Sequence, residues 1–530
     1  MALFLRNARA LLGAAAVATA GAACYPGGGG SNPPLDSLYF PVGLAVSPDG
    51  SRLYVVNSDF DLQYNGGTLQ SYDLQSIRNA AVGQIADGGA CAEQVPTNDF
   101  LGLGCAPPQP VTAYLTSSVV IGAFAADLQL SLSNPKRLFA PIRGETAVLF
   151  ADVDDQGNLS CPGGNGTRCA SGNYVGNDPN APPANTRHSV MSGEPFGIAQ
   201  TLDGTAIVVT SDSDTTASVL SSGIPASSAD GAVAAQSVEV SPSLQYVLSG
   251  LPFAGTGIAA IPHDRALNPP PCETSNEQLG CLRPAFLETN HSTAEIDLLR
   301  YYSDDDSLNP SGNRPFLQRE GAFPLTATTG SDERGIAIDD SPRSSCRASG
   351  GDDSACAILP ARVFVASRTP PALVLGEVGT PPSNYSGSFD PDLLTIVGTV
   401  PLPSGPSRVY RAPVIDRNGN YSLRIFVTCF DSDLVVVYDP ETRLWDSIHV
   451  GRGPFAMAFD PFPTDAYHPN DSAPWGQAAP SDRPYRFAYV ASFTESFVEV
   501  IDLDNSRPMS PSTYETVVFA LGEPMLPKGQ

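Results

Sequence analysis

Acidic residues recur in the same kind of short turn at three distant places in the chain, and carboxylates gathered in this way could bind a metal ion. The turns read Asn57-Ser-Asp-Phe-Asp61, Ser211-Asp-Ser-Asp214 and Phe430-Asp-Ser-Asp433. Calcium takes oxygen ligands, so Asp59, Asp212 and Asp431 form a candidate calcium site. Asp in a tight turn also commonly bonds the local backbone, so a purely structural role stays open.

Two arginines occupy the matching turns of other repeats and would partly neutralise these carboxylates. We expect the whole set to surround the mouth of a channel. The candidate cluster consists of Asp59, Asp61, Arg143, Asp212, Asp214, Arg368, Asp431 and Asp433.

Motifs of the common hydrolases are missing from the sequence. It has no Gly-x-Ser-x-Gly elbow, no His-Glu-x-x-His and no phosphate-binding Gly-rich loop, and its 5 histidines show no ligand spacing. Asp152-Val-Asp-Asp-Gln-Gly157 imitates the start of a calcium loop, but Gly163 stands where the bidentate Glu is required, so we expect a turn. We therefore assign no catalytic residue, and no cofactor beyond the calcium candidate.

The 10 cysteines indicate an oxidising compartment. Each of four close pairs encloses a turn-rich loop, and each spacing is wider than the two to four residues typical of zinc sites, so local disulfides are the better interpretation. Cys429 is left over within an apolar run and is expected to be a small buried hydrophobe. The predicted disulfides join Cys91 to Cys105, Cys161 to Cys169, Cys272 to Cys281 and Cys346 to Cys356.

The first residues read as an export signal. Residues 1–23 carry Arg6 and Arg9 before a short apolar run, which is typical of a cleaved signal peptide. The run Gly21-Ala-Ala-Cys24 resembles the lipobox of bacterial lipoproteins, although Gly21 stands where that family usually has Leu. The resemblance implies that Cys24 carries lipid and anchors the chain to a membrane. Cleavage without lipidation is the alternative. In either case, the residues that follow Cys24 up to residue 36 read as a flexible Gly- and Pro-rich tether.

Composition excludes several classes of protein. With 29 basic and 55 acidic side chains the net charge is -26, which argues against nucleic acid as a partner. The 49 Gly and 50 Pro disfavour an all-α fold, because both residues break helices. After the signal, no apolar stretch approaches the roughly 18 residues of a spanning helix.

An internal repeat organises the chain and must position these turns. Its clearest copy runs from Pro41-Val-Gly-Leu-Ala through Arg52-Leu-Tyr-Val-Val56 to Thr68-Leu-Gln-Ser-Tyr-Asp-Leu74. The short runs are apolar at consecutive positions, so each strand should be covered on both faces. Blades packed around an axis satisfy this requirement. The opening element recurs at 195–199, 255–259, 333–337, 406–409 and 454–458, with a weak copy at Ile121-Gly-Ala-Phe-Ala125.

The segment Pro41 to Asn57 resembles the YVTN family of β-propeller repeats found in bacterial surface and periplasmic proteins. We therefore predict an all-β propeller, with seven blades of four antiparallel strands and long disulfide-stapled loops. The domain should span residues 37–524 and leave a C-terminal tail at 525–530.

The strand order divides the predicted propeller into two ends. The Asp-turn end carries the turns between second and third strands and the crossings between blades. The stapled end lies opposite and should carry all four disulfide loops and the Pro-rich segment 462–484. The tether should leave from the Asp-turn end.

Recognition is expected in the long loops of the stapled end. We expect a lipid-anchored binding or scaffold module for an unknown protein or glycan at the bacterial cell envelope, placed on the outer membrane and facing the periplasm or the cell surface. Two alternatives stay open. One is a propeller enzyme, lactonase-like or quinone-linked dehydrogenase-like, and the other is a purely structural envelope component.

Overall fold

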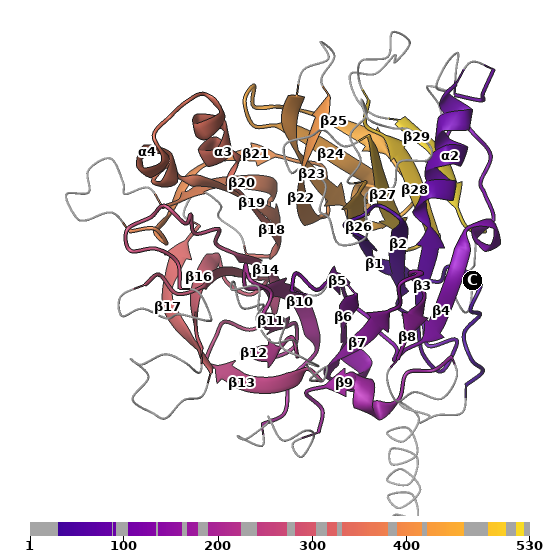
Figure 1. The fold of residues 1–530 in the computed structure, drawn as a ribbon, viewed down its shortest axis with the longest axis horizontal. Coiled ribbons are helices and arrows are strands. Elements are labelled where there is room, and N and C mark those ends of the chain that lie inside the picture. Colours follow the sequence, from indigo (N-terminus) through magenta and orange to yellow (C-terminus); the bar gives the residue numbers. More distant parts are fainter. Residues whose placement is uncertain are drawn as a thin grey trace, which may run out of the picture.

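Seven antiparallel sheets are arranged around a central axis, so the chain is an all-β, seven-bladed propeller (Figure 1). The repeat and fold class predicted from the sequence are confirmed. The computed structural model describes residues 30–523 except 87, 92–103, 134–135, 162–166, 179–188, 224–240, 273–280, 304–314, 326–330, 380–389, 416–420, 461–485 and 505–515.

Each blade runs outward from an innermost strand, and neighbouring innermost strands contact one another except between blades 2 and 3, where β10 contacts the second strand β6. Blade 1 contains β1 (Pro41–Val46), β2 (Arg52–Asn57), β3 (Thr68–Asp73) and β4 (Leu115–Val120). Blade 2 contains β5 (Gln129–Leu130), β6 (Arg137–Ile142), β7 (Ala147–Val153) and β8 (Leu159–Ser160), and β9 (Tyr174–Val175) also pairs with β7. Blade 3 contains β10 (Pro195–Gln200), β11 (Ala206–Ser211), β12 (Thr216–Ser221) and β13 (Ser243–Ser249).

The remaining blades repeat this order. Blade 4 contains β14 (Gly255–Ala260), β15 (Ala285–Asn290), β16 (Glu295–Tyr302) and β17 (Phe316–Pro324), and blade 5 contains β18 (Glu333–Asp339), β19 (Ala361–Arg368), β20 (Pro371–Val378) and β21 (Leu394–Pro401). Blade 6 contains β22 (Pro406–Ile415), β23 (Tyr421–Cys429), β24 (Leu434–Asp439) and β25 (Leu444–His449), and blade 7 contains β26 (Pro454–Phe459), β27 (Phe487–Ser492), β28 (Phe497–Asp502) and β29 (Thr516–Leu521).

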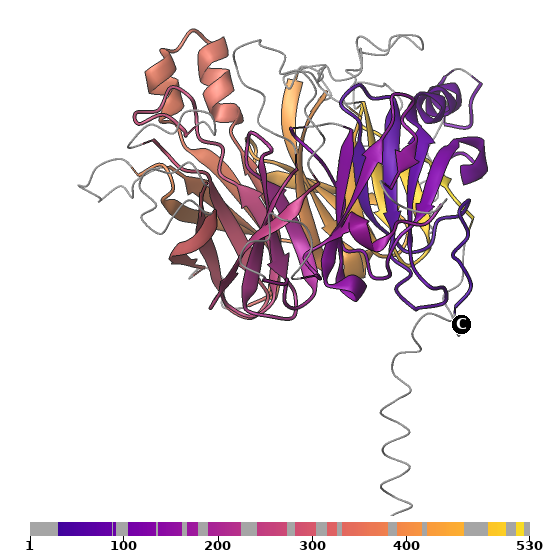
Figure 2. The ribbon, with the colours of Figure 1, turned by 60° about the horizontal axis from the view of Figure 1, so that its bottom comes forward.

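Few helices accompany the strands. The α-helices α2 (Leu74–Ile85), α3 (Ser341–Ala348) and α4 (Asp353–Ala357) lie at the stapled end (Figure 2). Short 3-10 helices occur at Val111–Ala113, Arg143–Glu145, Ser171–Asn173 and Phe430–Ser432.

Apolar cores fill every space between adjacent blades. In β2, Leu53 and Val55 belong to the core shared with blade 7, whereas Tyr54 and Val56 belong to the core shared with blade 2. Side chains alternate across a strand, so a strand buried on both faces must be apolar at consecutive positions. The described residues form seven such clusters, one between each pair of neighbours.

The innermost strands share a bulge and a close contact near the axis. A register shift lies at the start of β1, β10, β14, β18, β22 and β26. A β-carbon added to Gly197 would stand 2.3 Å from the carbonyl oxygen of Thr256, and one added to Gly257 would stand 2.3 Å from that of Arg334. Glycine in the repeat therefore lets the innermost strands of blades 1, 3, 4 and 5 approach the next strand closely.

A threonine of the second strand stabilises this bulge. The N–H of Gly197 donates to Thr210 Oγ1 at 2.9 Å, and the N–H of Gly257 donates to Thr289 Oγ1 at 3.0 Å. Thr256 Oγ1 in turn donates to the carbonyl oxygen of Glu333 in the next blade at 2.6 Å. Hydroxyl groups thus satisfy backbone groups that the bulge removes from the sheet ladder.

Recurring Arg and Asp residues of the repeat pair within the blades. Arg137 lies 2.6 Å from Asp152, and Arg424 lies 3.1 Å from Asp439. Each pair joins the start of the second strand to the end of the third.

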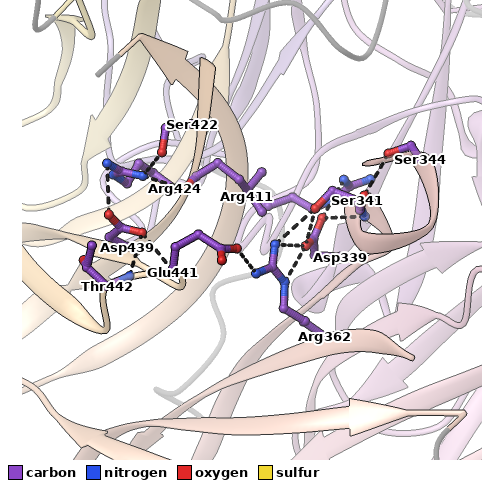
Figure 3. A network of polar contacts seen from close by, with 11 residues as sticks. Asp339, Ser341, Ser344, Arg362, Arg411, Ser422, Arg424, Asp439, Glu441 and Thr442 are labelled. Atoms are coloured by element: carbon purple, nitrogen blue, oxygen red, sulfur yellow. Dashed lines mark hydrogen bonds and ion pairs between the residues drawn. The ribbon is translucent and has the colours of Figure 1, made fainter. Parts of the chain in front are cut away.

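Between blades 5 and 6 the pairing becomes a network. Arg362 contacts Asp339 of its own blade at 2.9 Å and Glu441 of blade 6 at 2.7 Å (Figure 3). Arg411 of blade 6 reaches back to Asp339 at 3.3 Å. These ion pairs join the two blades on the stapled side of their shared core.

A segment that follows the first three strands of blade 1 pairs with the outer edge of blade 7. Residues 104–109, here named the clasp, run parallel to β29 along its outer edge. The N–H groups of Ala106 and Gln109 donate to the carbonyl oxygens of Val518 (2.9 Å) and Ala520 (2.8 Å). The disulfide between Cys91 and Cys105 lies beside this pairing, so a stapled insert of the first blade closes the circle.

All four predicted disulfides are confirmed, and Cys429 is buried as a free thiol. One expected position is wrong, because the Cys161–Cys169 loop does not lie at the stapled end. The N–H of Cys169 donates to the carbonyl oxygen of Val120 at the end of β4, and Arg168 contacts Asn65 in the turn between β2 and β3. The loop therefore reaches the Asp-turn end. The Pro-rich segment 462–484 lies outside the described residues.

The opening strand of blade 2 also differs from the prediction. The weak copy at 121–125 forms a crossing between blades, where Phe124 has a φ of 59° and Ala125 makes an isolated bridge to Ile142. Since φ near 60° is left-handed and incompatible with a strand, the innermost strand forms later, as β5.

The segment that precedes blade 1 lies against the Asp-turn end of the propeller. Residues 1–29, including the predicted signal and Cys24, lie outside the described residues. The first described residues contact the Asp-turn end, where the N–H of Asn65 donates to the carbonyl oxygen of Ser31 at 3.0 Å. The tether thus meets the propeller at the predicted end. Within the part of the chain that the structure describes, no helix is long and apolar enough to cross a membrane.

The close approach of inner strands predicts a selective sensitivity to added methyl groups. Replacing Gly257 by Ala should lower the free energy of unfolding by roughly 1–3 kcal/mol, because the new β-carbon must displace the backbone of Arg334. Gly398 lies in the outer strand β21, and a β-carbon added there would have no atom within 4 Å. Gly398→Ala is therefore the control and should be neutral or slightly stabilising. Chemical denaturation of both variants measures the difference, and equal stabilities would contradict the crowding argument.

Candidate functional site

A pocket of about 270 Å³ opens on the axis. It is lined by residues at the starts of the innermost strands, including Phe196, Arg334 and Phe455, and by Arg368 at the end of β19. Innermost strands begin, and second strands end, at the Asp-turn end. The pocket therefore lies at that end, and the bulges direct its lining side chains toward the axis.

Arg408 forms the charged centre of the pocket wall. It pairs with Asp127, and its Nη2 donates to the carbonyl oxygen of Ala126 at 2.9 Å. Its guanidinium carbon lies 5.0 Å from the ring centroid of Phe455 and 5.7 Å from that of Phe196. Despite burial, the Asp127 carboxylate holds the pKa of Arg408 above its usual range. Arg408 thus stays cationic between two aromatic rings.

Two further arginines line the pocket and make more exposed ion pairs. Arg334 pairs with Asp332, and Arg368 pairs with Asp431 of the next blade. The side chains of Arg368 and Asp431 are 27% and 49% exposed. Exposed pairs contribute about 0–1 kcal/mol, so little free energy holds Arg368 on Asp431.

The predicted channel-mouth cluster is only partly brought together. Arg368 contacts Asp431, and Arg143 lies 3.4 Å from Asp212, so both arginines neutralise an Asp turn of the following blade as expected. Arg143 also pairs with Glu194, a partner that the sequence analysis did not single out.

The other members of the cluster bond their own turn or a neighbouring segment of the chain. Asp59 accepts a hydrogen bond from the N–H of Tyr64, and Asp61 accepts one from Tyr39 Oη. Asp214 accepts from the N–H of Thr215. Asp433, with φ 55°, accepts from the N–H of Gly453 at 3.1 Å. The contacts of Asp59 and Asp214 match the structural role that was left open for Asp in tight turns, whereas Asp61 and Asp433 bond segments that precede or follow the turn.

The calcium candidate has no converging ligand set. Asp59, Asp212 and Asp431 belong to three different blades, and among the described residues no three His, Cys, Asp or Glu side chains are grouped as metal ligands. Burial raises the pKa of Asp59 to about 6, which disfavours its charged form. The acidic segment beginning at Asp152 is a turn as predicted, because Asp154 Oδ1 accepts from the N–H groups of Gln156 and Asn158.

An aromatic cluster at the Asp-turn end was missed by the sequence analysis. Its signal lies in the turns between second and third strands, because Phe60, Phe430 and Phe493 occupy this position in blades 1, 6 and 7. Ring centroids are 5.3 Å apart between Phe60 and Phe493 and 5.9 Å apart between Phe430 and Phe493. Phe493 also lies 6.1 Å from Phe455, which joins the cluster to the pocket wall.

Buried acids lie within the blades that surround the pocket. Burial raises the pKa of Glu333, next to Arg334, to about 7 and that of Glu499 in β28 to about 8. Burial likewise raises the pKa of Glu288 in β15 well above its usual range. Glu499 accepts hydrogen bonds from Ser492 Oγ at 2.8 Å and from the N–H of Gly451 at 3.2 Å. These acids are therefore protonated in the folded protein at mildly acidic pH.

Known proteins resemble the chain at a low level of similarity. The periplasmic gluconolactonase PpgL of Pseudomonas aeruginosa is 13% identical, with 78% of this chain and 86% of that chain covered and a TM-score of 0.41. The Kuenenia stuttgartiensis hydrazine synthase is 10% identical, with 90% of this chain and 99% of that chain covered and a TM-score of 0.42. The Myceliophteria thermophila Cps50 (Swd1) β-propeller domain is 8% identical, with 88% of this chain and 98% of that chain covered and a TM-score of 0.41. No protein-family model and no curated protein matches the sequence. These similarities assign no activity to this chain.

The buried acids predict that stability falls as pH rises. Between about 4.5 and about 8, Glu499 keeps its proton in the folded state but loses it in the unfolded chain, so unfolding releases a proton and becomes easier at higher pH. Glu499→Gln should reduce this slope by up to about 1.4 kcal/mol per pH unit. Denaturation curves at pH 5, 6, 7 and 8 provide the measurement. The exposed residue Glu523 gives the control, since Glu523→Gln should leave the slope unchanged.

Proposed function

We propose that the protein is an exported binding propeller whose axial pocket takes a small anion with an apolar part. The observation that carries this proposal is the charge of the lining. On a chain of net charge -26, the pocket is lined by three arginines and one Asp. Phe196, Phe455 and Met457 supply apolar surface beside these charges.

The pairing of the arginines supports an exchangeable anion site. Arg408 is held by Asp127 and by stacking, so it contributes a fixed positive charge. Arg334 has a partly buried partner and Arg368 an exposed one, and both arginines can turn from these to a ligand carboxylate or phosphate.

The lining favours binding over catalysis. Among the residues that line the pocket there is no His, Cys or Glu, and the one Asp is occupied by Arg408. Burial raises the pKa of Tyr410 to about 12, so its phenol stays protonated. A lactonase-like or dehydrogenase-like activity would need a general base or a cofactor contact that these side chains do not supply. Recognition through the loops of the stapled end remains a separate prediction, since much of those loops lies outside the described residues.

An envelope location completes the proposal. Four disulfides are typical of proteins that fold in an oxidising compartment. We further propose that lipid on Cys24 anchors the chain to the outer membrane, on the basis of the lipobox-like run that precedes it. The propeller would then be attached through the Asp-turn end, where Ser31 contacts Asn65.

The anion site is tested by calorimetric titration with benzoate and with its neutral analogue benzyl alcohol. Replacing both Arg334 and Arg368 by Gln should weaken benzoate binding about tenfold or more, because charge-assisted hydrogen bonds are lost, and should leave benzyl alcohol unaffected. Arg452, which pairs with Glu495 outside the pocket lining, provides the matched control Arg452→Gln. Undiminished benzoate binding in the double variant, or no binding to the wild type, would remove the proposal.

The anchor is tested by cell fractionation. Cys24→Ala should move the protein from the membrane pellet to the soluble exported fraction, because the variant lacks the residue that would carry the anchoring acyl chains. Cys429→Ala, which alters the buried free thiol, should leave fractionation unchanged. Pelleting of the Cys24 variant after a salt wash would contradict lipid anchoring.

A further inference from the structure

Aromatic side chains form a continuous apolar track that leads out of the axial pocket. Phe455 belongs to the pocket wall, and its ring centroid lies 6.1 Å from that of Phe493. Phe493 lies 5.3 Å from Phe60, which lies 5.8 Å from Phe124. We name these four residues the aromatic track. Phe60 is 49% exposed and the other three are half-buried, so the track presents apolar surface to solvent.

Charged side chains from blades 2, 3 and 5 lie near the same pocket. Arg334 and Asp332 come from blade 5, and Arg143 pairs with Glu194 at the crossing into blade 3. The aromatic track instead comes from blades 7 and 1 and the crossing into blade 2. The pocket mouth is thus apolar on one side and ionic on the other.

We infer that the ligand of this pocket is an amphipathic anion, with its acidic group at Arg334 and Arg368 and its apolar chain along the aromatic track. This inference rests on the proposed anion site and adds the class of ligand. Charge complementarity places the anionic group, because Arg334 and Arg368 line the pocket while their partners Asp332 and Asp431 are not among the lining residues. Continuity places the chain, because Phe455 belongs to both the pocket and the track. A small inorganic anion would leave the track unused, and a neutral apolar molecule would leave the arginines unused.

A homologous series of alkanoates tests the inference, with butanoate, hexanoate, octanoate and decanoate titrated into the full exported chain by calorimetry. Burial of each methylene group should strengthen binding about three- to fourfold along the series. Phe60 forms an exposed part of the track, so Phe60→Ala should reduce the gain between hexanoate and decanoate and leave butanoate unchanged. The Arg334→Gln, Arg368→Gln double variant should weaken all four ligands by a similar factor.

Phe253 supplies the matched control. It is 50% exposed, close to the 49% of Phe60, and it precedes β14 in blade 4, away from the track. Phe253→Ala should therefore bind every alkanoate like the wild type. Thermal melting of each variant verifies that the propeller is folded.

The outcomes separate this inference from the proposed function. If benzoate binds but alkanoate affinity does not rise with chain length, or if Phe60→Ala keeps the full gain, the amphipathic ligand is overturned and the anion site stands. Equal affinities of alkanols and alkanoates of the same lengths would also overturn it, because the acidic group would then add nothing to binding. If neither benzoate nor any alkanoate binds, both proposals fail.

Discussion

The circle of blades depends on how closely its innermost strands approach one another. At Gly197 and Gly257 a backbone carbonyl of the next blade occupies the space that a β-carbon would need. This contact brings blades 3, 4 and 5 together near the axis. The close approach requires a bulge, which leaves backbone N–H groups without a partner in the sheet. Threonine hydroxyl groups from the second strands accept hydrogen bonds from these N–H groups.

The same bulge produces the chemistry of the pocket. Because the glycine faces the neighbouring strand, the residue before it lies at the axis, and this position is Phe196 in blade 3, Thr256 in blade 4 and Arg334 in blade 5. Each blade can therefore contribute a different functional group without any change to its sheet. The fold fixes where these groups meet, and the residue at one position of each repeat decides what they can bind.

Much of the fold could be predicted from the sequence because its signals are local and repeated. Consecutive apolar positions in Leu53–Val56 report burial on both faces, and closely spaced cysteines report short covalent loops. Partners distant in sequence could not be predicted in this way. The clasp pairs residues 104–109 with β29, and the short β5 is displaced from the weak repeat copy by the left-handed conformation of Phe124.

The candidate site shows the same division. The arginines Arg143 and Arg368 were identified because they fill equivalent turns, and both do meet an Asp turn of the following blade. Arg334 and Arg408 were missed, because their role follows from the geometry of the axis and not from any motif. The Phe residues of the turns left a readable signal, since Phe60, Phe430 and Phe493 occupy the same turn in three blades, but only the structure shows that their rings touch.

The clasp also determines how the molecule would carry mechanical load. The strand that pairs with β29 comes from the middle of blade 1, after the Cys91–Cys105 bridge, and not from the segment that leads to Gly30. A force applied through the N-terminal segment therefore pulls first on the contacts of Ser31 and Asn32 with Asn65. Further along the segment, the N–H of Phe40 donates to Ser496 Oγ of blade 7, so the seam between the first and last blades comes next along the chain. Load at the attachment point therefore reaches the contacts with Asn65 before it reaches that seam.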